Sequence, residues 1–321
     1  MDKIYYICAQ PAVFYYAWQI DALLLSFEKN GNVDLNCVHI VSSTPRTGEP
    51  PEDYFVKVQK KWEKKGVLFE YYKDTRGHWG YISSIRPHLL KKHWQKHPWL
   101  EKENIFYHDC DIALTKPIDF ESFFDKNAQK ECYLSDTRSY IGPKYIESKG
   151  HGLLKDMCGA IDIDINLVKS KEEESGGAQY ILRPGIDYKF WDNVYKDCEK
   201  LYTNVNMRVM EVKREAPDWH EIQIWCADMW SVLWNLWKLG YSTPIREELD
   251  FTWANQAKPQ WEKNAIYHNA GVTGPNEPYF FKSMHINSNN PPTNAKIVDP
   301  GWASHYYQQL INEAYLNTTK S

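Results

Sequence analysis

The sequence has 321 residues, of which 43% are hydrophobic and 15% aromatic, enough to bury a large core and to exclude a disordered chain. Its formal net charge of -4 provides no overall basic field for nucleic acid or for an anionic membrane. The seven cysteines include no Cys-x-x-Cys pair, a pattern typical of reduced thiols rather than of a disulfide framework or a zinc site.

No internal repeat and no low-complexity linker interrupts the chain, so we expect a single domain over 1–321. The first residues, with an acidic second position and polar breaks, do not have the pattern of a signal peptide or a membrane anchor. No later segment is apolar enough to span a bilayer. We therefore expect a cytoplasmic protein without a membrane span.

Strands and helices are predicted in alternation through the first third of the chain. Short apolar runs predict the strands, and amphipathic stretches between them predict the helices. The predicted strands cover 3–9, 35–43, 67–73 and 104–114, and the predicted helices cover 14–31, 52–66 and 80–100. Such alternation is typical of a mostly parallel sheet with helices on both faces, where ligands bind beyond the carboxyl ends of the strands.

The last of these strands ends on two carboxylates, Asp109 and Asp111. Residues i and i+2 of a regular strand face the same side, so the two side chains would converge. Two hard oxygen ligands form half of a site for Mg²⁺ or Mn²⁺, which takes its other ligands from water, a third side chain and substrate phosphates. A D-x-D triplet also arises by chance at solvated strand ends. Here, however, the strand is apolar on both faces, and a charge that enters it needs a partner such as a metal.

A second D-x-D triplet lies in the segment 159–168. Asp162 and Asp164 alternate with isoleucines there, and this two-residue period predicts a half-buried strand. We interpret these two carboxylates as structural.

Three groups of segments together resemble the metal-dependent glycosyltransferases of the GT-A fold. "YISSIRPHLL" ahead of "NIFYHDCDIAL" looks like that family's helix with a Tyr and an Arg, followed by a strand that ends in D-x-D. "SGGAQYIL" is similar to the Gly-Gly-x-Gln segment of plant hydroxyproline O-arabinosyltransferases and serine galactosyltransferases, and "YHNAGV" resembles the His-x-x-Gly of retaining GT-A enzymes. The resemblance covers residues 4–282.

The resemblance implies an α/β GT-A fold with a mixed, mostly parallel central sheet flanked by helices. It also implies a nucleotide-sugar-binding half in 1–115 and an acceptor-binding half in 116–321, which ends in a C-terminal helix. Asp109, Asp111 and His268 are the implied ligands of Mn²⁺ or Mg²⁺. The implied contacts to the nucleotide sugar are Ala9, Gln10, Tyr81, Arg86, Asp109, Gly177, Gln179 and Lys282.

Two of these candidates can also be interpreted in other ways. His268 follows a short apolar strand and precedes a glycine-rich loop, where it could complete a two-carboxylate metal site or make an ordinary strand-end hydrogen bond. The family's lysine after His-x-x-Gly is not at its usual spacing, and Lys282 is the available candidate.

The glycines of "SGGAQYIL" lie between a charge run and a predicted helix. Gly176 and Gly177 let the backbone approach a ligand, and the amide of Gln179 could bond sugar hydroxyls. The alternative is a flexible loop followed by a helix cap.

The segment 218–240 is rich in tryptophan and predicts a helix. Trp230, Trp234 and Trp237 have the i, i+4, i+7 spacing of a core-facing stripe. The two tryptophans outside the stripe, Trp219 and Trp225, could wall an acceptor pocket.

Carboxylates in the same segment are candidates for the catalytic site. In the related enzymes an acid in this region lies near the transferred sugar, which makes Asp228 the preferred catalytic contact. Glu221 is the reserve, and Gln179 is a third candidate for contact with the transferred sugar.

We expect a nucleotide-sugar-dependent transferase that moves a pentose or hexose, from UDP-sugar most simply, to a saccharide or glycan hydroxyl. The His-x-x-Gly and Gly-Gly-x-Gln likenesses favour retention of configuration. One alternative is a transferase for hydroxymethylated DNA bases of a virus, in which the basic runs 60–66 and 86–97 would meet phosphates. Another is a noncatalytic carbohydrate-binding protein on the same scaffold.

Overall fold

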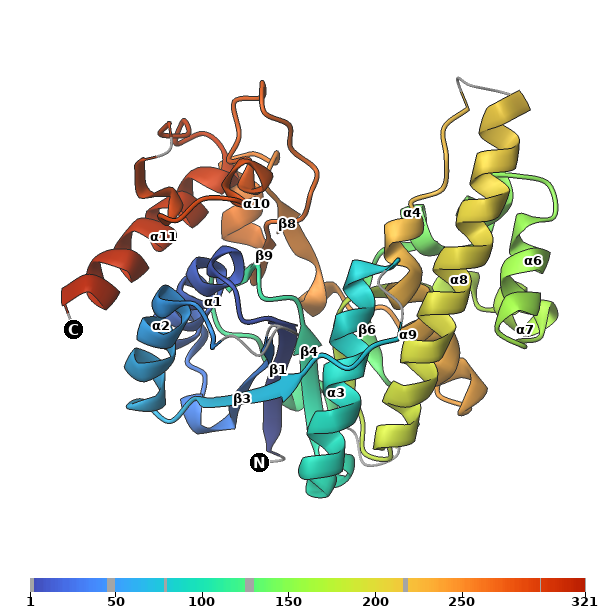
Figure 1. Cartoon of the computed structure of the whole chain (residues 1–321), viewed down its shortest axis with the longest axis horizontal. Helices are drawn as coiled ribbons and strands as arrows, with labels where there is room; N and C mark the ends of the chain where they lie inside the picture. Colours follow the sequence, from blue (N-terminus) through green and yellow to red (C-terminus); the bar gives the residue numbers. More distant parts are fainter. Residues whose placement is uncertain are drawn as a thin grey trace.

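A computed structural model describes residues 3–44, 50–77, 80–124, 130–215, 219–294 and 296–320 (Figure 1). In this part of the chain the central sheet has the strand order β3-β2-β1-β4-β7-β6. Its strands are β1 (Ile4–Pro11), β2 (Val38–Thr44), β3 (Leu68–Lys73), β4 (Asn104–His108), β6 (Tyr133–Asp136) and β7 (Gly176–Leu182). β3, β2, β1 and β4 are parallel, whereas β7 runs antiparallel to both β4 and β6. The expected α/β architecture with a mixed, mostly parallel sheet is confirmed.

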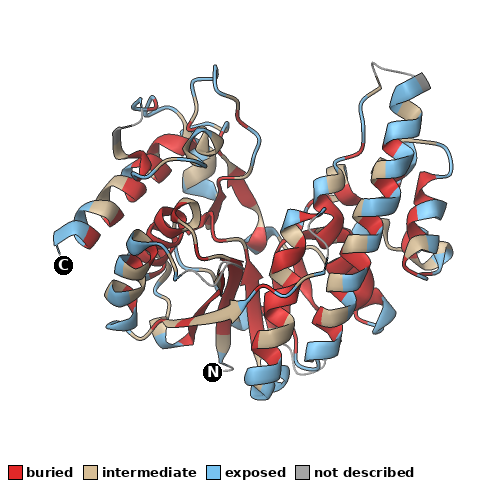
Figure 2. Cartoon of the chain, viewed as in Figure 1, coloured by how far each residue is buried: buried red, intermediate tan, exposed pale blue. Residues whose placement is uncertain are grey.

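Helices cover both faces of this sheet because the strands are apolar on both faces, and Figure 2 shows the sheet as a buried layer. On one side α1 (Phe14–Ser26) packs against α2 (Asp53–Glu63) and the C-terminal helix α11 (Ala303–Lys320). On the other, α3 (Ile85–Lys96) packs against α8 (Tyr188–Glu215), which in turn packs against α9 (Ala227–Lys238). Figure 1 shows these two groups on opposite sides of β1 and β4.

A second, small sheet lies beyond the end of β4. Its strands are β5 (Ile112–Leu114), β9 (Ile266–His268) and β8 (Phe251–Trp253), in the order β5-β9-β8. β5 runs antiparallel to β9, and their register pairs Ile112 with His268. The chain thus passes from the central sheet to the small sheet between His108 and Ile112, where both candidate carboxylates lie.

Short helices complete the described structure. They are α4 (Arg138–Ile141), α5 (Pro143–Ser148), α6 (Leu153–Ala160), α7 (Ile165–Ser170) and α10 (Lys258–Lys263). Within the described ranges, no helix combines the length and the apolar character needed to cross a bilayer. The functional division into halves 1–115 and 116–321 stays a prediction, although β6 and β7 from the second half join the sheet of the first.

The expected strand over 159–168 is wrong. The segment contains the end of α6, a turn and the start of α7. Asp162 has a positive φ of 55° in the turn, and the Asp164 carboxylate accepts the Asn166 N–H at 2.9 Å as the N-cap of α7. Ile161 and Ile163 are buried beside these exposed carboxylates. The alternation of buried and exposed residues that predicted a strand therefore comes from a turn between two helices.

Three other predicted elements are corrected in part. The segment 176–182 is the buried strand β7, not a loop before a helix. The predicted strand 104–114 is divided between β4 and β5. The tryptophan-rich helix starts only at Ala227, so Trp219 and Trp225 precede it.

Candidate active site

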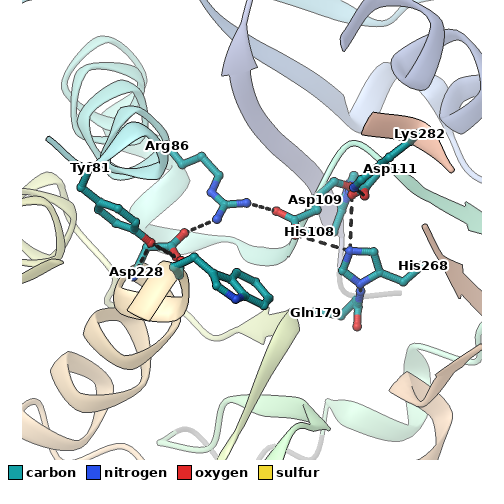
Figure 3. Close-up of polar contacts among 10 residues, drawn as sticks. Tyr81, Arg86, His108, Asp109, Asp111, Gln179, Asp228, His268 and Lys282 are labelled. Atoms are coloured by element: carbon teal, nitrogen blue, oxygen red, sulfur yellow. Dashed lines mark hydrogen bonds and ion pairs between the residues drawn. The ribbon is translucent and has the colours of Figure 1, made fainter. Parts of the chain in front are cut away.

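Both carboxylates of the D-x-D triplet lie in the connection between the two sheets. β4 ends at His108, Asp109 follows it and Asp111 lies in a turn, so the two residues do not extend a regular strand as expected. Their side chains nevertheless approach the same point, as Figure 3 shows. Asp111 is buried and Asp109 is partly exposed. A buried carboxylate is costly unless charges or a metal compensate it.

His268, the last residue of β9, faces both carboxylates. Its Nε2 lies 3.3 Å from Oδ1 of Asp111 and 3.5 Å from Oδ2 of Asp109 (Figure 3). The ligand atoms of the three residues lie within 4.8 Å of one another. Two carboxylate oxygens and one imidazole nitrogen are a donor set that suits Mn²⁺, and carboxylates are the ligands that Mg²⁺ prefers. The residues present therefore fit a divalent metal ion.

The charges in this cluster shift one another's pKa. Burial disfavours the charged imidazolium of His268, but Asp111 and Asp109 outweigh it and raise the pKa of His268 to about 9. Burial would raise the pKa of Asp111, but Lys282 and His268 outweigh that effect and hold it below its ordinary value. Burial would also raise the pKa of Asp109, but Arg86 and His268 outweigh that effect and lower it. Both carboxylates are thus ionised at neutral pH, whereas His268 carries a proton that a divalent metal ion would have to displace in order to bind.

Lys282 joins the cluster from a distant part of the sequence. It begins a short 3₁₀ helix, Lys282–His285, and its Nζ makes an ion pair with Oδ2 of Asp111. The side chain also lines the adjacent cavity. Lys282 thus places a cation beside the candidate metal ligands.

Arg86, on α3, bridges the cluster to a second buried carboxylate. Its Nη1 donates to Asp109 and its Nη2 donates to Asp228 (Figure 3). The Tyr81 hydroxyl lies 2.6 Å from Oδ1 of Asp228 and accepts the Asp228 N–H at 3.0 Å. Burial and the nearby Asp228 raise the pKa of Tyr81, so the phenol stays protonated and can donate to the carboxylate.

Gln179 is placed behind His268. The antiparallel pairing of β7 with β4 sets Gln179 opposite His108. Its Nε2 lies 3.2 Å from Nδ1 of His268, while its Oε1 accepts the Ser135 hydroxyl at 2.7 Å. The side chain is fully buried, so in this structure the amide orients the imidazole ring instead of reaching sugar hydroxyls.

The glycine pair has a packing role. A Cβ on Gly177 would lie 2.7 Å from Oη of Tyr180 and 2.8 Å from Cε of Met229. A Cβ on Gly176 would lie 2.5 Å from the carbonyl oxygen of Ser135, on the neighbouring strand. A side chain at Gly176 would therefore collide with the backbone of β6, whereas one at Gly177 would require the ends of the Tyr180 and Met229 side chains to move.

A cavity of about 770 Å³ opens in front of the cluster, a volume in the range of ligand-binding pockets. Seven of its lining residues belong to the predicted site: Ala9, Gln10, Arg86, Asp109, Asp111, His268 and Lys282. Tyr81, Gly177, Gln179 and Asp228 lie behind this wall, where they contact its members.

Glu221 is not part of this cluster. It is exposed, pairs with Lys213 of α8 at 2.9 Å and does not line the cavity at the cluster, so its role as a reserve catalytic carboxylate stays a prediction. The two tryptophans before α9 also differ from each other. Trp225 is 55% exposed and lines the cavity, whereas Trp219 borders a separate cavity of about 150 Å³.

Several lining residues were not predicted. Tyr15, Tyr16 and Gln19 come from α1, and Tyr140, Tyr145 and Trp253 come from the second half of the chain. The Trp253 ring is stacked parallel to His268, with 6.3 Å between ring centroids. None of these side chains lies in a recognisable motif, because only the fold brings the segments together.

No family model matches the chain, and no curated protein matches it. Solved structures of glycosyltransferases are similar to it at low identity. The apo form of the bifunctional glycosyltransferase WbbM is 11% identical with a TM-score of 0.47, over 91% of this chain and 51% of that chain, so this chain spans about half of its length. The galactosyltransferase LgtC, in complex with donor and acceptor sugar analogues, is 10% identical with a TM-score of 0.43, over 95% of both chains.

The apo form of the glycosyltransferase GlyE of Streptococcus pneumoniae TIGR4 is 10% identical with a TM-score of 0.40, over 99% of this chain and 64% of that chain. All three TM-scores are below 0.5. The functional proposal therefore rests on the residues of the site.

Proposed function

We propose that this protein is a GT-A glycosyltransferase that uses a divalent metal, Mn²⁺ or Mg²⁺. It moves a pentose or hexose from a nucleoside diphosphate sugar, UDP-sugar most simply, to a hydroxyl acceptor. One observation carries the proposal: Asp109, Asp111 and His268 meet on the wall of a ligand-sized cavity beyond the carboxyl ends of β1 and β4. The sequence resemblance assigns the same three residues to the metal.

The charges around the cavity suit a diphosphate leaving group. A divalent ion held by the three residues supplies charge neutralisation to the departing nucleoside diphosphate. Lys282 and Arg86 add two cations that line the same cavity, each beside one carboxylate of the cluster. In the reaction, the acceptor oxygen bonds to the anomeric carbon of the donor sugar while the bond from that carbon to the phosphate oxygen breaks.

The set of carboxylates supports retention. Among the described residues that line the cavity, the carboxylates are Asp109 and Asp111, both of which are needed for the metal. An inverting enzyme needs a further carboxylate to take the acceptor's proton from the opposite face, whereas a retaining one can pass that proton to the departing phosphate. Asp228 is already engaged by Arg86 and Tyr81, which favours a role in positioning over one as a general base.

A nucleotide-release assay tests the function. A panel of UDP-sugars and other nucleoside diphosphate sugars is incubated with the protein, with Mn²⁺ or with EDTA. We expect release of the nucleoside diphosphate from at least one donor with Mn²⁺ and none with EDTA. The same donor should raise the melting temperature, because a ligand at a hundred times its dissociation constant stabilises the folded state by about 2.7 kcal/mol. Release that is unaffected by EDTA contradicts the proposal.

The site does not support either alternative function, a transferase for hydroxymethylated DNA bases or a noncatalytic carbohydrate-binding protein. Four lysines of the basic runs are paired with acidic residues of this chain: Lys61 with Asp21, Lys65 with Glu28, Lys91 with Asp192 and Lys96 with Glu70. These pairs reduce the charge available for DNA phosphates. A noncatalytic carbohydrate-binding protein would bind sugar without consuming a donor, and the release assay separates it from an enzyme.

A further inference from the structure

A second cavity, of about 790 Å³, adjoins the one at the cluster. The two cavities share the lining residues Ser139, Tyr145 and Trp253. The second cavity extends from these residues along α4 and α5 on one side and along β8 and α10 on the other. A ligand that reaches the cluster past Tyr145 and Trp253 can therefore continue into this space.

The charges that line the second cavity balance. The lining acids are Asp136, Glu172 and Asp250, and the lining cations are Arg138, Lys144 and Lys263. Three negative and three positive groups leave no net field for a polyanion or a polycation. The lining thus favours an uncharged ligand that is rich in hydrogen-bonding groups.

Amides and aromatic rings supply the contacts that such a ligand needs. In the described part of the chain, the side-chain amides of Gln260 and Asn264 have no hydrogen-bond partner, although both line the cavity. Each amide offers donors and an acceptor to hydroxyl groups. Tyr145 and Trp253 offer apolar ring surfaces next to them. Amides that bond hydroxyls beside rings that cover C–H surface are complementary to a sugar ring.

We propose that the second cavity binds the distal units of a neutral oligosaccharide acceptor, whose reacting unit lies over Tyr145 and Trp253 at the cluster. The role as acceptor rests on the proposed function, whereas the binding of the oligosaccharide does not. An oligosaccharide acceptor that spans both cavities explains why two cavities of similar volume adjoin across shared aromatic residues. A nucleic acid or an anionic glycan would instead bring its charges against Asp136, Glu172 and Asp250 without a net positive field.

The binding test uses the protein without metal or donor. Maltotriose, cellotriose, mannotriose and xylotriose are examined by saturation-transfer NMR, with a heparin-derived tetrasaccharide and a single-stranded oligonucleotide as anionic probes. We expect saturation transfer to at least one neutral trisaccharide. The double variant Gln260→Ala, Asn264→Ala should weaken its binding at least tenfold. The matched variant Asn166→Ala, which removes an exposed amide on α7, should bind as the unaltered protein does.

Three outcomes overturn the inference: no neutral trisaccharide binds, the double variant binds it unchanged, or an anionic probe binds this cavity more tightly. Circular dichroism of the double variant checks that it is folded. The inference and the proposed function can fail separately. Nucleotide release without trisaccharide binding overturns the inference alone, and trisaccharide binding without release from any donor overturns the proposed function alone.

Discussion

Asp109 and Asp228 are held at the two ends of one guanidinium group, that of Arg86 (Figure 3). Asp109 belongs to the connection between the two sheets, and Asp228 belongs to the first turn of α9. The planar guanidinium is suited to this bridge because it presents its donors in a fixed fork. A candidate metal ligand is thereby coupled to a helix of the second half of the chain.

We expect Arg86→Lys to impair catalysis although it keeps the positive charge. A single ammonium cannot hold both carboxylates in the geometry of the guanidinium, so Asp109 should lose its fixed orientation. Turnover in the release assay should fall about tenfold to a hundredfold, which corresponds to about 1.4 to 2.8 kcal/mol of barrier. The control is Arg208→Lys, at an exposed pair with Glu211 on α8. Unchanged turnover in Arg86→Lys would show that the bridge has no role.

The two D-x-D triplets permit a matched comparison. Asp111→Asn should abolish the response to Mn²⁺, because the buried carboxylate of the cluster becomes a neutral amide. Asp164→Asn should leave it intact, since asparagine also caps a helix and Asp164 is exposed. Mn²⁺ binding by electron paramagnetic resonance, together with nucleotide release, checks both variants. Loss of binding in Asp164→Asn but not in Asp111→Asn would falsify the assignment.

The sequence predicted the part of the site that depends on strand ends and local motifs. An apolar strand that ends on Asp109 is visible without a structure, because a buried strand is a continuous apolar run. The turn that follows β4 could not be predicted, because two aspartates spaced two residues apart fit a continuing strand as well as they fit a turn. The same ambiguity led to the incorrect prediction of a strand around Asp162 and Asp164. Asp162 lies in a turn and Asp164 is the N-cap of a helix, and each is preceded by a buried isoleucine.

The rest of the site depends on contacts between distant segments. Gly176 and Gly177 are typical of a loop, yet they lie in β7, where a Cβ on Gly176 would collide with the backbone of β6. Gln179 was predicted as a sugar contact but lies behind His268. This position follows from the pairing of β7 with β4, which the sequence alone does not reveal. Trp253 reaches the cavity through the small sheet, which no local pattern predicts.

Asp21 should be one of the most important residues for stability outside the site. It is buried and accepts Lys61 Nζ at 2.8 Å, Trp62 Nε1 at 2.7 Å and Thr318 Oγ1 at 2.6 Å, so it ties α1 to α2 and α11. Asp21→Asn leaves the nearly buried ammonium of Lys61 without its counter-charge, which should lower the free energy of unfolding by about 3 to 5 kcal/mol. Urea denaturation measures it.

An exposed ion pair to the same helix provides the control. Glu313 of α11 pairs with Lys29, and both side chains are roughly half exposed. Because solvent screens such pairs, Glu313→Gln should cost about 0 to 1 kcal/mol. Equal losses in Asp21→Asn and Glu313→Gln would mean that burial of the first pair does not matter.

A buried histidine pair should make the protein less stable in mild acid. Nδ1 of His39 lies 2.9 Å from Nε2 of His93. Burial lowers the pKa of His39 from its ordinary 6.5 to about 4, and burial with the nearby His39 lowers the pKa of His93 well below its ordinary value. Between pH 6.5 and about 4 the unfolded chain therefore binds protons that the folded chain does not, and stability falls as the pH falls.

His39→Gln should reduce this pH dependence, because one of the histidines that protonate on unfolding is removed. The lowering of the His39 pKa from 6.5 to about 4 corresponds to a loss of about 3 kcal/mol in the free energy of unfolding between neutral pH and pH 4. Free energies of unfolding at pH 7 and pH 4 check it, with His151→Gln at an exposed position as the control. The prediction fails if His39→Gln and the unaltered protein lose the same stability over that range.

The role of Asp228 can be separated from that of a general base by stereochemistry and pH. If the enzyme retains configuration, Asp228 serves to hold Arg86 and Tyr81, and it removes no proton. Asp228→Asn should then lower turnover by roughly ten- to a hundredfold, at about 1.4 kcal/mol per tenfold, and leave the shape of the pH profile unchanged. Asp156→Asn, at an exposed position on α6, is the control. The coupling of the anomeric proton in the product, read by NMR, gives its configuration. An inverted product, with the low-pH limb of the rate profile abolished in Asp228→Asn, would instead make Asp228 the base.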